Sequence, residues 1–185
     1  MSSEVMRNHI QKLVQPTDSE WETFYSKFKM RELAKDELFL QEGDVCRKIA
    51  FVICGSLRMF YTIQGEERCK DFQFEGQFTG SMFSLLTQQP SKFSVAALEE
   101  CQVLQISREH LYDLYDRFKI WERFGRIYME QLFIYKEKRE ASLLFDSSAV
   151  RYEKLLRTFR VYQSNSSEGP CLLPGHKAGI FKSDS

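Results

Sequence analysis

The first 35 residues show the hydrophobic spacing of a helix. Thr17–Glu20 has the form of a capping box, in which a threonine and a glutamate three residues apart close the first turn reciprocally. Trp21, Phe24, Tyr25 and Phe28 follow at positions i, i+3, i+4 and i+7. The pattern predicts a helical region to about Lys35, with an amphipathic helix whose aromatic face belongs to the hydrophobic core.

Between Asp36 and Ser107 the pattern changes to that of short strands. β-Rich runs recur about every ten residues: LFLQ, IAFVIC, SLRMFYTI, CKDFQF, FSVAAL and CQVLQIS. Glycine turns separate several of these runs, at Gly43, Gly55, Gly65 and Gly76. Regular short strands with glycine turns predict an antiparallel β-roll or barrel.

The chain is helical again from about Arg108. The segment 116–145 contains no proline and a single glycine, Gly125, so it predicts one helix about 45 Å long. A small roll cannot cover that length, and a second copy of the chain is the simplest partner. The alternative is a helix that lies wholly on its own domain. The residues expected in the dimer seam are Ile120, Phe124, Ile127, Gln131 and Ile134.

The last 40 residues divide into a helix and a tail. Asp146-Ser147-Ser148 predicts a break and a new helix start, followed by a short helix that ends near Phe159. Residues 160–185 have no sustained period and contain Gly169, Pro170, Pro174, Gly175 and Gly179. We expect this tail to be disordered.

Composition and charge narrow the function classes. The chain has 185 residues, of which 43% are hydrophobic and 28% charged, so it can form a packed core. Lys+Arg and Asp+Glu are both 26, so any DNA binding must come from a local patch. The longest apolar run, Ile49–Cys54, is too short to span a membrane, and residues 1–10 do not resemble a secretory signal. A cytoplasmic protein is the expectation.

No metal or cofactor site is predicted. The five cysteines are scattered without a C-x-x-C pair, and no histidine occurs between His9 and His110. Iron–sulfur, haem and zinc sites need such ligands. A cupin-type metal enzyme needs histidines inside the roll, and neither a P-loop nor a nucleophile elbow is present, so the chain is not expected to be an enzyme.

Four segments of the chain resemble the Crp/Fnr family of bacterial transcription regulators. They are FLQEGDVCRKIAFVICGSLRMFY (39–61), EGQFTGSMF (75–83), VLQISREHLYDLYDRF (103–118) and SSAVRYEKLL (147–156). The first contains a Gly-acidic turn followed twelve residues later by a Gly-Ser turn, and the last resembles the first helix of a winged-helix domain. The overall likeness is to the short regulators of Bacteroidetes-type bacteria.

The resemblance implies an α+β fold with three parts. These are a cyclic-nucleotide-binding-like β-roll with its N-terminal helix (1–115), a long dimerisation helix (116–145), and a remnant of a winged-helix DNA-binding domain with the tail (146–185). An effector in the roll would shift the long helices of a homodimer and reorient the DNA-binding heads.

The resemblance also places the effector site. Members that bind cyclic nucleotides hold the ribose with a glutamate and the phosphate with an arginine ten residues further on; ungapped alignment puts Ser81 and Ser91 there. Lys92 is expected to face away from the pocket. Without both charges, we expect weak cAMP binding or none. The roll either encloses another small molecule or has no small ligand. In the first case the lining would be Gly80, Ser81, Met82, Ser91 and Ser94.

The tail lacks the helix-turn-helix text of the family. Back-translation of residues 161–185, read one nucleotide later with free choice at degenerate bases, can give FINRIPLKALASYLGIKPESLSRI, which resembles that text. We therefore predict a frameshift near residues 159–161 and a defective DNA-binding head. The alternative function is a dimeric sensor or interaction module that does not bind DNA.

Overall fold

The structure is a computed structural model that describes residues 2–166, with side chains to residue 158. Its helices are α1 (Ser2–Gln11), α2 (Asp18–Tyr25), α3 (Met82–Thr87), α4 (Arg108–Arg117), α5 (Lys119–Phe145) and α6 (Ser148–Ser166). Its strands are β1 (Lys29–Leu33), β2 (Leu38–Leu40), β3 (Lys48–Cys54), β4 (Leu57–Ile63), β5 (Glu66–Gln73), β6 (Phe78–Thr79), β7 (Ser94–Ala97) and β8 (Cys101–Ser107).

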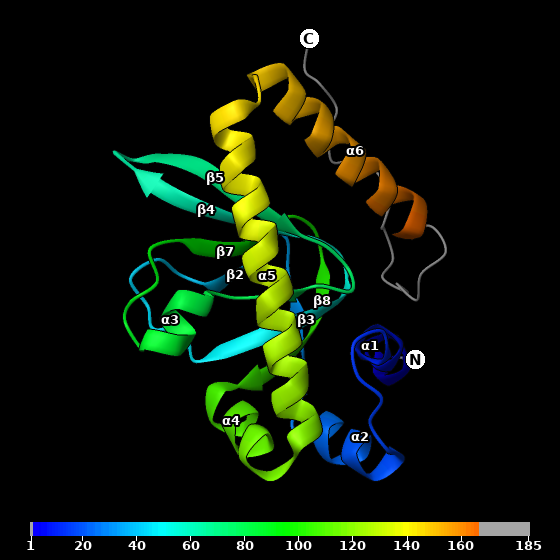
Figure 1. The fold of residues 1–185 in the computed structure, drawn as a ribbon. Coiled ribbons are helices and arrows are strands. Elements are labelled where there is room, and N and C mark those ends of the chain that lie inside the picture. Colours follow the sequence, from blue (N-terminus) through cyan, green and yellow to red (C-terminus); the bar gives the residue numbers. More distant parts are fainter. Residues whose placement is uncertain (1, 167–185) are drawn as a thin grey trace.

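The strands form the predicted antiparallel roll. One sheet has the order β1-β8-β3-β6 and the other β2-β7-β4-β5, and all pairings are antiparallel. The long helix α5 crosses the roll and extends to the β4–β5 hairpin, while α1, α2 and α4 gather at the other end (Figure 1). The α+β fold class expected from the sequence is confirmed.

The N-terminal capping box is confirmed, but the helical region is shorter than predicted. The Glu20 N–H donates to Thr17 Oγ1 at 3.3 Å, and the Thr17 N–H donates to Glu20 Oε2 at 2.8 Å. The expectation of helix to Lys35 is wrong beyond Tyr25, because β1 pairs with the free edge of β8 from Lys29 to Leu33. Strand β6 and helix α3 were not predicted.

The aromatic face of α2 joins the first turns of α5. Phe24 stacks on Trp121 with ring centroids 3.9 Å apart, and Phe124 lies edge-on to Phe24 at 6.4 Å. Phe78 of β6 closes the cluster, 6.1 Å from Phe124. These contacts attach the beginning of α5 to its own roll.

Two helix boundaries differ from expectation. The predicted helix 116–145 is interrupted at Phe118, which has extended φ and ψ of −134° and 110° and separates α4 from α5. The predicted break at Asp146–Ser148 is confirmed, with the Val150 N–H donating to Ser147 Oγ at 3.3 Å. Helix α6 continues to Ser166 instead of ending near Phe159, since the first helix-opposing residue after Phe159 is Gly169. The tail 167–185 lies outside the described residues.

Candidate functional site

Gly80, Ser81 and Met82 form the head of α3. Gly80 has a φ of +134°, and a Cβ there would lie 3.1 Å from Ile49 Cγ2. Ser81 is the N-cap residue of α3, but its side chain makes no cap hydrogen bond and is buried without a partner in the described chain. Thr79 Oγ1 is also buried and unpartnered in the same part of the structure. These two unpartnered hydroxyls are the polar groups that the structure places at the head of α3, within the predicted effector site.

Ser91 and Ser94 form hydrogen bonds with backbone groups of nearby turns. The Ser91 hydroxyl donates to the Phe93 carbonyl oxygen at 2.8 Å, and its N–H donates to the Asp44 carbonyl oxygen at 2.8 Å. Ser94 Oγ accepts the Glu42 N–H at 2.9 Å. Lys92 is exposed, as expected. Both serines therefore fasten β7 and the segment before it to the turn that contains Gly43.

The five predicted lining residues do not meet in one cavity. Ser94 lies in a groove with Arg58 and Phe60, because alternation along β7 turns its neighbours Phe93 and Val95 into the core instead. Met82 lines a separate apolar cavity. Ser94 and Met82 therefore line different spaces, and ligand binding at Gly80, Ser81, Met82, Ser91 and Ser94 stays a prediction.

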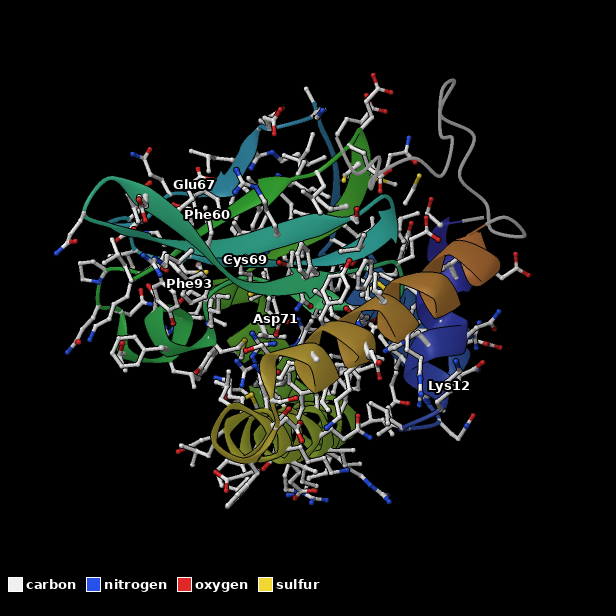
Figure 2. The ribbon with its side chains drawn as sticks, turned by 90° about the horizontal axis from the view of Figure 1, so that it is seen from above. Lys12, Phe60, Glu67, Cys69, Asp71 and Phe93 are labelled. Atoms are coloured by element: carbon white, nitrogen blue, oxygen red, sulfur yellow. The ribbon has the colours of Figure 1, made fainter. Side chains whose placement is uncertain are left out.

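A cation that sequence reasoning missed lies over the ring of Phe93, two residues after Ser91 in the chain. Lys70 is the extra residue of a β-bulge, since Met59 and Phe60 of β4 pair with Asp71 and Cys69 of β5. Its Nζ is 3.6 Å from the centroid of the Phe93 ring and 5.8 Å from that of Tyr61. Figure 2 shows Phe93 and β5 from above. The bulge is the reason that strand alternation could not place Lys70.

The charge of Lys70 should make stability depend on pH. Burial, followed by repulsion from Lys136, lowers the pKa of Lys70 to about 8 from 10.5. Between these values the unfolded chain binds the extra proton, so stability gains from Lys70 as pH rises from about 8 to 10.5. We expect Lys70→Met to stabilise the protein at pH 7 by about 1 kcal/mol, allowing for screening by solvent and a lost cation–π contact.

Urea unfolding of both proteins from pH 7 to pH 10 measures this effect. The stability difference should shrink as pH passes about 8, and Lys92→Met, which changes an exposed lysine, should show no such trend. A stability difference between Lys70→Met and the wild type that stays constant from pH 7 to pH 10 would contradict the lowered pKa of Lys70.

The residues predicted for the dimer seam divide into two groups. Phe124 is 5% exposed in the aromatic cluster, and Ile120 and Ile127 pack against the same core. Ile134 is 52% exposed. The interpretation of Phe124 as a seam residue is therefore replaced by a role in its own domain, and dimerisation itself stays a prediction.

Helix α5 is also tied to the roll at its far end. The Tyr135 hydroxyl donates to Asp71 Oδ2 at 2.9 Å, and Arg139 Nη1 lies 3.2 Å from Asp71 Oδ1. Asp71 belongs to β5, next to Lys70, and lies between the hairpin and α5 (Figure 2). These polar contacts therefore connect the β4–β5 hairpin directly to α5.

Within residues 2–166, no three His, Cys, Asp or Glu side chains are placed to hold a metal ion. None of the described helices is long and apolar enough to cross a membrane.

The comparisons with known proteins identify the roll. Residues 30–118 match the family model described as cyclic nucleotide-binding domain. No curated protein sequence matches the chain.

Solved structures share the fold at low sequence identity. The catabolite activator protein of Thermus thermophilus has 24% identity and a TM-score of 0.59, over 69% of this chain and 60% of that one. A cyclic nucleotide-binding domain from Methylobacillus flagellatus has 19% identity and a TM-score of 0.65, over 77% of this chain and 82% of that one.

A third neighbour is the sensor domain of the transcriptional regulator DNR from Pseudomonas aeruginosa. It has 11% identity and a TM-score of 0.60, over 79% of this chain and 94% of that one. The chain spans 60% of the length of the Thermus protein, so only part of that regulator has a counterpart here. Residues 30–118 thus match the cyclic nucleotide-binding domain, and the roll shares its fold with the sensor domain of a bacterial transcriptional regulator.

Proposed function

We propose that the chain is a cytoplasmic, homodimeric Crp/Fnr-type transcription regulator whose roll does not respond to cAMP. The observation that supports this best is the order of the elements: a sensor-type roll, the long helix α5 and the capped helix α6. The structural neighbours include proteins named as transcriptional regulators or their domains. An effector in the roll would act on α5 through the Asp71 contacts to Tyr135 and Arg139.

The dimer surface that we propose is the outer part of α5. Phe133 is 64% exposed, Ile134 52% and Leu144 74%, and all three follow Tyr128, the last residue of α5 that packs against the hydrophobic core. Exposed apolar side chains along one long helix favour pairing with the same helix of a second copy.

Titration with cAMP tests the proposed effector selectivity. Ser81 and Ser91 are buried at 1% and 2% exposure, and neither supplies a charge for a phosphate anion. We expect isothermal calorimetry at pH 7 to give no binding at micromolar cAMP. A dissociation constant in the micromolar range or tighter would overturn the proposal, and a melting curve of the same sample provides the control for folding.

We propose that the DNA-binding head is defective in this polypeptide. A recognition helix must place side chains on base edges in the major groove. Residues 160–185 offer Arg160, Lys177, Lys182 and His176 among the glycines and prolines that oppose a helix. The alternative, a dimeric module that does not bind DNA, is favoured by this same composition.

Selection from a randomised duplex library separates the two functions. One chain is used as written, and a second has residues 161–185 replaced by FINRIPLKALASYLGIKPESLSRI. We expect the second chain alone to enrich a symmetric site, at least about 10³-fold over random DNA. Sequence-specific retardation of DNA in a gel by the unchanged chain would refute the proposed defect in DNA binding. The nucleotide sequence across codons 159–161 decides whether a frameshift is its cause.

A further inference from the structure

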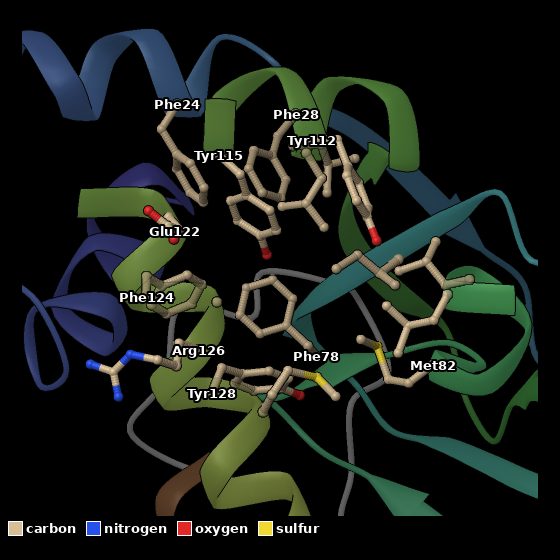
Figure 3. A pocket seen from close by; sticks show the side chains of 17 residues that line it. Phe24, Phe28, Phe78, Met82, Tyr112, Tyr115, Glu122, Phe124, Arg126 and Tyr128 are labelled. Atoms are coloured by element: carbon tan, nitrogen blue, oxygen red, sulfur yellow. The ribbon is translucent and has the colours of Figure 1, made fainter. Parts of the chain in front are cut away.

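A cavity of about 140 Å³ lies between α3, α4 and α5, against the sheet that contains β3, β6 and β8 (Figure 3). Its wall contains Phe78 of β6, Tyr112 and Tyr115 of α4, and Phe124 and Tyr128 of α5. Of the residues predicted to bind an effector, only Met82 lines it. The cavity therefore shares Met82 with the head of α3, but Gly80, Ser81, Ser91 and Ser94 are not among its lining residues.

The interior of this cavity contains no charged group. Its two charged lining residues, Glu122 and Arg126, are exposed, and Figure 3 shows the Arg126 guanidinium directed away from the space. Burial raises the pKa of Tyr115 and Tyr128 to about 12, so both phenols are neutral near pH 7. A charged molecule would lose its hydration there without an ionic partner.

Gly125 gives the cavity its shape. A Cβ at this position would lie 2.6 Å from Tyr115 Oη and 2.8 Å from Tyr115 Cζ. The Tyr115 ring can therefore rest on α5 only because residue 125 has no side chain. Glycine inside a helix costs about 0.5–1 kcal/mol relative to alanine, so this position gives up helix stability for that contact.

We propose that the cavity is a binding site for a small, uncharged molecule with one aromatic ring. Its volume is close to that of a cavity of about 150 Å³ that admits benzene, and its aromatic walls can pack against a ring edge-on or stacked. Tyr115 is part of the cavity wall, and its hydroxyl can pair with one polar group of the ligand. The site depends neither on cyclic nucleotide binding nor on DNA binding.

Calorimetric titration of the full chain with phenol tests the site. We expect a dissociation constant of the order of 1 mM or tighter, a reasonable limit for so small a ligand. N-methylpyridinium, a charged ring of similar size, should bind at least about tenfold more weakly. Absence of phenol binding, or equal binding of the cation, would overturn the proposal.

The variant Gly125→Ala tests whether phenol binds in this cavity. The added methyl group should push Tyr115 into the cavity and weaken phenol binding at least about tenfold. Gln131→Ala, at an exposed position of the same helix, should bind phenol like the wild type. Tyr115→Phe supplies an independent readout if Gly125→Ala does not fold, because it should weaken phenol several-fold and leave toluene binding unchanged. Phenol binding that neither cavity variant alters would contradict this location.

Discussion

Replacing Phe124 by aspartate is expected to unfold the protein, whereas the same change at Ile134 should leave it folded and separate a dimer. Phe124 is 5% exposed and contacts the rings of Phe24, Trp121 and Phe78. Loss of such a ring alone costs about 3–5 kcal/mol, and the buried carboxylate adds its desolvation. Domains have a free energy of unfolding of only about 5–15 kcal/mol, so the Phe124→Asp protein should be unfolded at 25 °C.

Ile134 gives the matched comparison on the same helix. Its side chain is 52% exposed, so a carboxylate there keeps much of its hydration in the monomer but would be buried between paired helices. Thermal unfolding by circular dichroism and sedimentation velocity at micromolar concentration measure the two effects, with Ile134→Leu as the conservative control. A folded Phe124→Asp protein, or an Ile134→Asp protein that sediments like the wild-type dimer, would contradict the division of α5 into a roll-facing and a partner-facing part.

Gly55→Ala is expected to be far more damaging than Gly43→Ala, although both glycines have positive φ, +89° and +92°. A Cβ at Gly43 meets nothing within 4 Å, so its cost is that of the left-handed backbone, about 1–2 kcal/mol. A Cβ at Gly55 would lie 2.7 Å from the Glu100 carbonyl oxygen and 3.1 Å from Cys101 Cα. Backbone atoms cannot move aside as a side chain can, so β3, β4 and β8 would have to separate.

Urea unfolding of the two alanine variants distinguishes these costs. Gly43→Ala should retain a cooperative transition at a moderately lower midpoint, and Gly55→Ala should lose most or all of its folded population. Similar midpoints for the two variants would show that backbone conformation alone, without the close approach of Glu100 and Cys101, explains the glycine at position 55.

The two glycines also show how far a motif can be interpreted. The sequence predicts turns at both positions from their neighbours and their spacing. It does not distinguish a turn in open space from one pressed against another strand. That difference depends on Glu100 and Cys101, which are 45 or more residues away in the chain.

The candidate site was less predictable than the fold. Ser81 and Ser91 were identified by resemblance, and the structure buries both. Lys70 was missed because side-chain direction in a strand follows register, and a β-bulge at Lys70 changes the register by one residue. The apolar cavity needs residues from α3, α4 and α5 to converge, which no single segment indicates.

The sequence alone determined the features that depend on near neighbours. These are the capping box at Thr17, the strand runs and their glycine turns, and the break at Asp146–Ser148, all of which result from local hydrogen bonding and backbone preference. Only the tertiary structure decided what each apolar face contacts. Periodicity shows that Phe124 lies on an apolar stripe, but whether the stripe meets its own roll or a second copy depends on where α2 and β6 lie, and packing across distant segments sets that position.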